Sequence, residues 1–374
     1  MTQVVITGTG VFTPENVITN EELVTAFNTY ADNFNEKNAA AIDAGEINAV
    51  PHSSPEFIKK ASGIEQRYVL NKTGVLDPDI MHPVLRAREE SELSQMAEMA
   101  VAAAKVALQK AGKTASEIDA VICAASNHER AYPAIAIEVQ EALEIKGFAF
   151  DMNVACSSAT FGIQAARDMI RGGSARSILI VNPEICSAHL EWRDRDCHFI
   201  FGDVCTAMIL ERADLALSDS RFEIIDTRCV TEFSNNIRND AGFLRRTREG
   251  HMQDRRDMLF RQEGRKVFRE VVPLVSALIT EHLEANDLSA DQLSRLWLHQ
   301  ANKTMNDFIG SKVLGRTPEK HEQPNILQNY ANTSSAGSII AFSQHSDDLN
   351  SGDLGVICSF GAGYSAGSII VKRL

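Results

Sequence analysis

Residues 153–162 read NVACSSATFG, and this stretch joins an apolar run to a string of small residues. The run FAFDMNVA, which ends at Ala155, predicts a buried strand, and SSATFGIQAARDMIRGG, which starts at Ser157, predicts a helix. Cys156 is therefore expected at a strand-to-helix turn, where free backbone N–H groups and the helix dipole lower the pKa of a thiol. Because free cysteines are commonly buried and inert, the stretch alone leaves two interpretations open, a nucleophile or a core residue.

On both sides of this stretch, short runs rich in Val and Ile alternate with helix-like segments. Examples are QVVITGTG and RSILIVNPE in the first half, and LSRLWLHQ and LGVICSFGAG in the second. This alternation is typical of an α/β protein with buried strands. Two α/β halves, residues 1–215 and 216–374, describe it most simply. Two polar stretches, 30–55 and 71–90, predict inserts over the active site or at a dimer edge.

Composition and cysteine content bound the class of protein. The 374 residues are 44% hydrophobic and 23% charged, which is ordinary for a globular protein with a large core. The first residues show no signal pattern, and no apolar run approaches the roughly 20 residues of a membrane span, so we expect a cytoplasmic protein. Seven cysteines without a CxxC pair favour reduced thiols over a disulfide framework or a zinc site.

The charge is unevenly distributed along the chain. A formal net charge of −13 argues against a nucleic-acid binder that neutralises phosphates. Residues 241–270 nevertheless hold nine Arg or Lys against five Asp or Glu. This local excess is either a solvated helical face with compensating pairs or a docking patch for an acidic partner.

Neither a dinucleotide site nor a metal site is predicted. The GTG at 8–10 follows a predicted strand, but Thr13 stands where the third glycine of a dinucleotide fingerprint would be. The segment DRDCH at 194–198 has metal-ligand residue types but no second cluster at a suitable spacing.

Two further stretches supply side chains that could act with Cys156. WLHQAN places His299 at the end of a predicted strand, and NYANTSSAG places Asn332 before a helix start. Taken singly, the histidine is most simply a satisfied structural residue and the asparagine an N-cap. Taken together with a thiol nucleophile, they are the two neutral hydrogen-bond donors that acyl-thioester chemistry requires, because negative charge develops on a carbonyl oxygen.

At these residues the chain resembles the β-ketoacyl-acyl carrier protein synthase III family of the thiolase superfamily. The resemblance is carried by DMNVACSSATFG, LWLHQANKTM, NYANTSSAGS and SFGAGYSAGS, and it runs nearly end to end. The two inserts make it most similar to the longer subgroup that forms β-ketodecanoyl-acyl carrier protein. The resemblance implies a five-layered αβαβα fold with two similar halves, and a homodimer.

The resemblance also implies a reaction. Cys156 matches the nucleophile that takes an acyl group from an acyl-CoA, octanoyl-CoA in the longer subgroup. His299 and Asn332 match the pair that binds the thioester carbonyl of malonyl-acyl carrier protein and stabilises the enolate formed when CO₂ leaves. The product is a β-ketoacyl-acyl carrier protein of fatty acid biosynthesis, and no metal or redox cofactor is needed.

Residues around the site are matched in the same way. Phe57 stands where family members present a Trp to CoA, and Ala61 where they present an Arg, so that contact is lost unless Lys59, Lys60 or the insert supplies it. Tyr132 matches a residue that enters the acyl pocket of the partner subunit. Docking of the acidic carrier protein is expected at a set of basic residues: Arg265, Lys266, Arg269, Lys303 and Lys312.

Rival interpretations remain. Thiolases carry an Asn at the position of His299, a His at that of Asn332, and a second cysteine near the C-terminus. Cys358 is one residue out of register with that second cysteine, so we expect Cys358 to be a buried strand residue. A condensing enzyme of secondary metabolism, or one for head-to-head condensation, would have the same three residues. A catalytically silent thiolase-fold partner subunit would have no chemical need for them.

Overall fold

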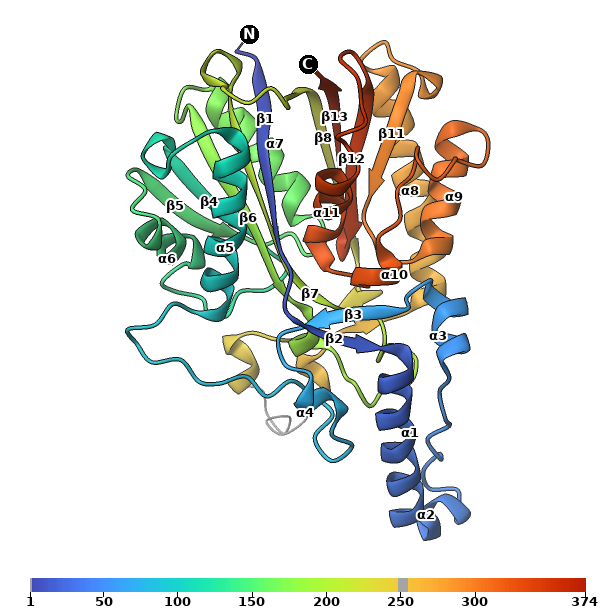
Figure 1. Ribbon diagram of the computed structural model, residues 1–374. Coiled ribbons are helices and arrows are strands. Elements are labelled where there is room, and N and C mark those ends of the chain that lie inside the picture. The colour runs from blue at the N-terminus through green and yellow to red at the C-terminus, as the bar shows by residue number, and fades with distance from the viewer. Residues whose placement is uncertain (1, 248–254) are drawn as a thin grey trace.

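A continuous sheet runs through the molecule in the computed structural model, which describes residues 2–247 and 255–374 (Figure 1). The nine strands follow the order β11-β12-β13-β8-β1-β7-β6-β4-β5. Their bounds, in chain order, are β1 (Val4–Phe12), β4 (Ala120–Ala124), β5 (Phe148–Met152), β6 (Ser177–Ile185), β7 (Asp203–Arg212), β8 (Phe222–Ser234), β11 (Leu293–Leu298), β12 (Leu354–Gly361) and β13 (Gly363–Arg373).

The sheet consists of two parts with the same strand pattern. In the first, β1 is antiparallel to β7, β7 is antiparallel to β6, and β6 is parallel to β4. In the second, β8, β13, β12 and β11 repeat this sequence of pairings. The two parts meet through a short antiparallel contact between β1 and β8. The predicted division of the chain at residue 215 falls between β7 and β8 and stays a prediction.

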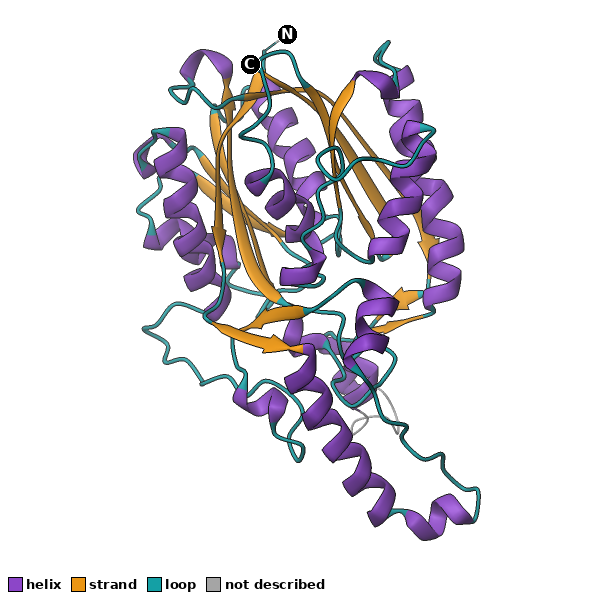
Figure 2. Cartoon of the chain, turned by 45° about the vertical axis from the view of Figure 1, so that its right-hand side comes forward, coloured by secondary structure: helices purple, strands orange, loops and turns teal. Residues whose placement is uncertain are grey.

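Helices form three layers around the two parts of the sheet (Figures 1 and 2). Helices α5 (Gln95–Ala111) and α6 (Ile135–Ala142) cover the outer face of the first part. Helix α7 (Ser158–Arg171) contacts strands of both parts, and α11 (Gly337–Gln344) contacts β1, β11 and β12, so both lie in the middle. Helices α8 (Gly264–Glu284) and α9 (Lys303–Leu314) cover the second part. The expected αβαβα fold with two similar halves is confirmed.

The GTG segment at 8–10 serves packing. A Cβ on Gly8 would lie 2.2 Å from the carbonyl oxygen of Ala107, and one on Gly10 would lie 2.0 Å from that of Ala103. Both alanines belong to the fully buried face of α5. The glycines in β1 and the alanines in α5 therefore let helix and strand approach more closely than larger residues would permit.

The predicted inserts differ in structure. The first stretch, 30–55, continues α1 (Asn20–Lys37), which a capping box at Thr19 starts, and includes α2 (Ala39–Asp43) before the chain reaches α3 (Pro55–Ser62). Figures 1 and 2 show α1 and α2 as an arm that projects from the body. The second stretch, 71–90, holds the short helix α4 (Thr73–Leu76) and otherwise has turns and irregular structure.

The remaining elements are short and flank the body. They are β2 (Asn16–Thr19), which pairs with β3 (Gln66–Val69), β9 (Ile237–Arg238), which pairs with β10 (Arg261–Gln262), and α10 (Leu327–Tyr330). Within the described part of the chain, no helix combines the length and apolar character that a membrane crossing needs.

Candidate active site

Cys156 lies in the tight turn between β5 and α7, as the sequence predicts. Ala155 just before it has a positive φ of 47°, a left-handed conformation that is costly for a residue with a Cβ. Gly361 at the end of β12 faces this turn, and a Cβ there would lie 2.6 Å from the Cβ of Cys156. The two halves thus meet at the thiol, and only a glycine fits opposite it.

The electrostatic setting of Cys156 differs from the expectation. Burial raises the pKa of its thiol to about 11, although a hydrogen bond from the Ser334 hydroxyl and backbone contacts at Ala362 favour the thiolate. The charge of Glu184 raises the pKa further. The backbone groups of the turn favour the thiolate, as expected, but desolvation outweighs them, so the net pKa of the thiol is raised.

His299 directly follows β11 and is almost fully buried. Its backbone N–H donates to the carbonyl of Cys358 (2.7 Å), its carbonyl accepts from Asn306 (2.9 Å), and its ring packs edge-on against Phe360 at 5.2 Å. Burial lowers its pKa to about 4, against a smaller opposing effect of the Ser334 backbone. The imidazole is consequently neutral near pH 7, and one ring nitrogen carries a hydrogen that it can donate.

Asn332 lies in the turn between α10 and α11. Its backbone N–H donates to the carbonyl of Ile200 (2.9 Å), and its carbonyl accepts from the N–H of Gly202 (3.1 Å). The segment before β7 therefore fixes the backbone of this turn. Its side-chain oxygen accepts from the Ser334 N–H at 2.9 Å, which leaves the amide N–H groups for a ligand. Cys358, by contrast, is fully buried in β12, as expected.

Ser334 joins the three predicted residues, and sequence reasoning missed it. Its hydroxyl donates to the Cys156 sulfur at 3.4 Å, its N–H donates to Asn332, and its backbone lies close enough to His299 to affect the imidazole pKa. Its φ of 49° is left-handed, which folds the turn back toward the thiol. The only signal in the sequence is its place in NTSSAG, two residues after Asn332.

Phe57 lies in α3 beneath a cation that the sequence did not predict. The guanidinium carbon of Arg195 stands 4.0 Å from the centre of the Phe57 ring, and its Nε donates to the carbonyl of His52 at 2.7 Å. Lys59 instead pairs with Glu65 at 2.9 Å. An aromatic face and a guanidinium plane held together in this way suit the stacking of a flat heterocycle.

Tyr132 and the predicted basic residues lie outside this cluster. Tyr132 is 85% exposed on the loop before α6. Arg265, Lys266 and Arg269 lie in the first turns of α8, while Lys303 and Lys312 lie on α9, which packs against α8. Within the basic stretch 241–270, residues 248–254 lie outside the described part of the chain.

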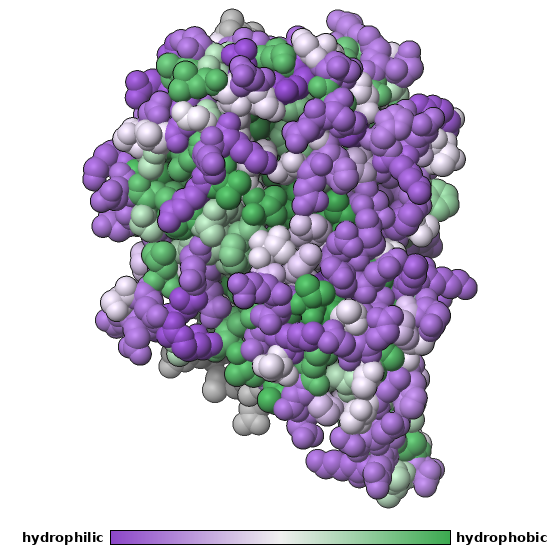
Figure 3. Space-filling model, in the orientation of Figure 1, coloured by the Kyte–Doolittle hydropathy of each residue, from purple (hydrophilic) through white to green (hydrophobic). Residues whose placement is uncertain are grey.

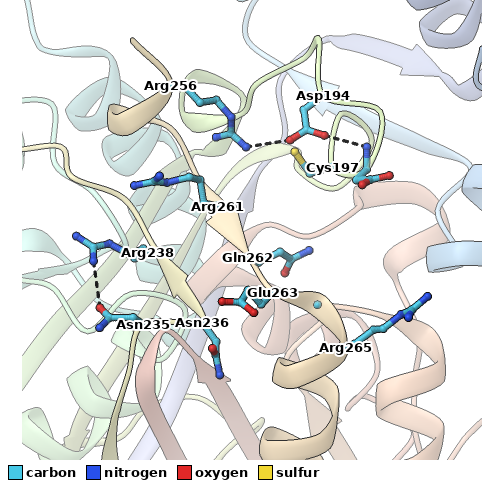
Figure 4. A pocket seen from close by; sticks show the side chains of 12 residues that line it. Asp194, Cys197, Asn235, Asn236, Arg238, Arg256, Arg261, Gln262, Glu263 and Arg265 are labelled. Atoms are coloured by element: carbon cyan, nitrogen blue, oxygen red, sulfur yellow. Dashed lines mark hydrogen bonds and ion pairs between the residues drawn. The ribbon is translucent and has the colours of Figure 1, made fainter. Parts of the chain in front are cut away.

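A polar cleft of about 730 Å³ opens beside the start of α8 (Figure 4). Its arginines are engaged with acids: Arg256 with Asp194, and both Arg238 and Arg261 with Asp240. Arg265 points toward the rim away from these pairs. The neighbouring groove, about 670 Å³, is lined by Gly264, Arg265, Phe268 and Arg269.

One group of possible metal ligands occurs among the described residues, formed by Cys123, His128 and Asp151. Both carboxylate oxygens of Asp151 accept backbone N–H groups of Ile135 and Ala136 at 2.8 Å. This carboxylate therefore serves the start of α6, whose positive dipole end opposes a bound cation. The donor set does not fit a metal centre.

Comparisons with known proteins place the chain. The family described as 3-oxoacyl-[acyl-carrier-protein (ACP)] synthase III matches residues 150–232, and its C-terminal counterpart matches residues 283–373. The chain is 59% identical over 348 residues to a β-ketodecanoyl-[acyl-carrier-protein] synthase of Pseudomonas aeruginosa, covering 93% of this chain and 99% of the relative. It is 31% identical over 376 residues to a β-ketoacyl-[acyl-carrier-protein] synthase III of Acidiphilium cryptum, covering 100% of each chain.

Solved structures agree with these relatives. The 3-oxoacyl-[acyl-carrier-protein] synthase III of Aquifex aeolicus superposes with a TM-score of 0.75 at 26% identity, covering 99% of both chains. A priming β-ketosynthase of the R1128 polyketide pathway gives a TM-score of 0.77, covering 99% of this chain and 96% of its own, but at 22% identity it shows only a shared fold. On its similarity to the relatives over nearly its whole length, this chain belongs to the 3-oxoacyl-[acyl-carrier-protein] synthase III family of condensing enzymes.

Proposed function

We propose that Cys156 takes an acyl group from an acyl-CoA and that malonyl-acyl carrier protein extends this group by two carbons, in fatty acid biosynthesis. The observation that carries the assignment of residues is the position of Ser334, which contacts the sulfur of Cys156 and the amide oxygen of Asn332 and lies against His299. These contacts support the assignment of a nucleophile and two neutral donors to one site.

The reaction follows from these groups. The sulfur of Cys156 attacks the acyl-CoA carbonyl, the CoA thiolate leaves, and it takes up the proton that the cysteine loses. The malonyl group then releases CO₂, and the electron pair of the broken C–C bond moves onto the thioester oxygen, where His299 and Asn332 donate hydrogen bonds. The enolate carbon attacks the acyl-cysteine, and the C–S bond breaks. The cysteine thiolate that leaves takes up a proton from solvent, which restores the thiol. These steps need no metal or redox cofactor.

We infer that the donor carries eight carbons. The relative at 59% identity is named for a β-ketodecanoyl product, which has ten carbons in its acyl chain. Since a malonyl-derived extension adds two carbons, such a product requires an octanoyl donor. Phe57 under Arg195 supports CoA as the carrier of that group, because the pair offers a platform for its adenine.

Docking of the acyl carrier protein is proposed at the start of α8 and on α9. Among the residues that the structure describes, no ion pair engages Arg265, Arg269 or Lys312, whereas Lys266 and Lys303 pair with Glu263 and Asp307. Phe308, half exposed on α9, packs edge-on against Phe268 at 5.5 Å. Free cations around an aromatic pair suit an acidic helix with apolar residues.

A homodimer is proposed through β5, the edge strand of the first part of the sheet. Phe148 in β5 is 40% exposed and Ile137 in the neighbouring α6 is 46% exposed, close to the loop of Tyr132. Figure 3 shows hydrophobic side chains gathered over this side of the molecule. Pairing of two edge strands would cover them and would carry Tyr132 toward the partner subunit. Because its substrates are intracellular, we expect the enzyme to act in the cytoplasm.

The test is the intact mass of the protein after incubation with acyl-CoAs of two to twelve carbons, followed by malonyl-acyl carrier protein. We expect one octanoyl adduct, absent from Cys156→Ala and cleared by the malonyl substrate. An adduct cleared only by a second acyl-CoA would indicate head-to-head condensation. No adduct with any acyl-CoA would contradict the proposed donor.

A further inference from the structure

Glu184 is a buried carboxyl group that the proposed reaction does not use. It lies near the end of β6, and 1% of its surface is exposed. One oxygen accepts the backbone N–H groups of Ser126 (3.0 Å) and Ser335 (3.2 Å), and the two serine hydroxyls contact the carboxyl at 2.5 Å. Across residues 2–247 and 255–374, no Lys, Arg or His forms an ion pair with it.

The two serines connect Glu184 with the reaction site. Ser335 is the next residue after Ser334, whose hydroxyl donates to the Cys156 sulfur, and it belongs to the same turn as Asn332. Ser126 begins the loop that leads to Tyr132. The carboxyl group therefore connects the turn of Asn332 and Ser334 to the loop of Ser126 in the first half of the molecule.

The surroundings of Glu184 favour its neutral form. Burial raises its pKa to about 7, against the hydrogen bonds of the serines, which favour the carboxylate. The titratable groups that it affects electrostatically carry no positive charge: Cys123, Cys156, Cys186 and Cys205. Asp203 is a second buried acid whose charge also raises the pKa of Cys186.

The hydrogen-bond geometry also accommodates a protonated carboxyl. The hydroxyl of Ser335 has a second acceptor, the carbonyl of Ala124 at 3.3 Å. It can therefore receive a hydrogen bond from the carboxylic acid and pass its own hydrogen to that carbonyl. A negative charge on Glu184, in contrast, would stand near the sulfur and oppose its conversion to a thiolate.

We propose that Glu184 is a positioning residue of the condensing site, which holds the turn of Asn332 and Ser334 near Cys156 through Ser335, and that its negative charge, where present, opposes formation of the Cys156 thiolate. The role of the turn in condensation rests on the proposed function. The charge relation between Glu184 and the cysteine does not, because it is a property of the free protein.

Alkylation of Cys156 by iodoacetamide tests the charge relation without any substrate. The rate is measured by intact mass from pH 6 to 10 for the wild type and Glu184→Gln, after thermal melting confirms that the variant folds. We expect alkylation of Glu184→Gln to be at least about threefold faster at pH 9. Asp203→Asn is the matched control, because Asp203 is an equally buried acid held by Ser187 and the Leu70 N–H. If the alkylation rate of Glu184→Gln equals that of the wild type, or if Asp203→Asn changes the rate as much, the proposed charge relation between Glu184 and Cys156 is overturned.

Condensation rates test the positioning. The glutamine side chain in Glu184→Gln can still accept from Ser335, whereas the methyl group in Glu184→Ala cannot, so we expect kcat of Glu184→Gln to exceed that of Glu184→Ala about tenfold. If the alanine variant does not fold, Ser335→Ala replaces it and should lower kcat similarly while alkylation of Cys156 continues. Equal kcat in wild type and these variants overturns the positioning role. A wild type that condenses nothing but shows the expected alkylation profile contradicts only the proposed function.

Discussion

Cys156 is protonated in the free protein, because burial outweighs the helix start and the hydrogen bond from Ser334. Its reactivity must therefore depend on what arrives with the substrate. His299 and Asn332, the proposed donors to the enolate, differ from the thiol: His299 is neutral and Asn332 is uncharged, so both can donate hydrogen bonds to a developing negative charge without losing a proton. In the proposed reaction, Cys156 must lose a proton, whereas His299 and Asn332 keep theirs.

Gly361 sets the space around the thiol. A Cβ at this position would lie 2.6 Å from the Cβ of Cys156, so Gly361→Ala should displace the turn and slow acylation by about a hundredfold. Intact-mass kinetics with octanoyl-CoA measure the effect. Gly242→Ala is the control, because no atom of the described residues lies within 4 Å of its side-chain position. Equal acylation rates for the two variants would show that the turn of Cys156 accommodates the added methyl group without loss of activity.

Arg195 has a testable role at the proposed CoA entrance. Arg195→Ala removes the cation over Phe57 and should raise KM for octanoyl-CoA about threefold to tenfold, with little change in KM for malonyl-acyl carrier protein. Arg193→Ala is matched in type and location, but Arg193 lies 5.4 Å over Tyr30 instead. If Arg193→Ala raises KM for octanoyl-CoA as much as Arg195→Ala does, the platform is not the CoA site.

The helices α8 and α9 pack together, and both carry cations of the proposed docking surface. Arg269→Glu should raise the apparent KM for malonyl-acyl carrier protein about tenfold, more so at low salt, while acylation of Cys156 changes little. Arg212→Glu changes the net charge equally at a surface pair with Asp214 and serves as the control. An unchanged KM would remove Arg269 from the docking surface.

The packing of α5 on β1 gives a prediction about stability. Gly10→Ala places a methyl group 2.0 Å from the Ala103 carbonyl oxygen, so strand and helix must separate. We expect the free energy of unfolding to fall by about 1 to 3 kcal/mol, measured by urea unfolding against Gly242→Ala. A loss no larger than that of the control would mean that the contact between α5 and β1 is loose.

Across the whole molecule, buried histidines set the response to acid. Burial lowers the pKa of His299 and His189 to about 4 and that of His198 to about 3. Between the unfolded value of about 6.5 and these folded values, the unfolded chain binds more protons, so stability is lost as pH falls from about 6.5 toward 4.

Glu184 and Asp203 oppose this trend. Burial raises their pKa values to about 7 and about 6, so the folded state holds protons that the unfolded chain releases. Their contribution to the free energy of unfolding is therefore lost as pH rises from about 4.5 to 7. Glu184→Gln should therefore make the decline in unfolding free energy between pH 7 and 4.5 steeper than in the wild type. Urea unfolding at fixed protein concentration measures both slopes, and a shallower slope in the variant would contradict the assignment.

The sequence predicts the fold and the three central residues because these depend on local patterns and motifs: alternating apolar runs, and short stretches around Cys156, His299 and Asn332. It does not predict what depends on distant segments. Arg195 meets Phe57 only through the tertiary fold, and neither Lys59 nor Lys60 takes that place. The raised thiol pKa likewise reflects burial, which a motif does not report.

The burial of the thiols affects the sensitivity of the protein to oxidation. The pKa of every one of the seven cysteines is raised by desolvation, including that of Cys156, the proposed nucleophile. Peroxides attack thiolates rather than thiols, so an idle molecule offers them little to react with. We therefore expect the cysteines to resist oxidation between turnovers. Cys156 is most easily oxidised when it becomes a thiolate, which happens when substrate is bound.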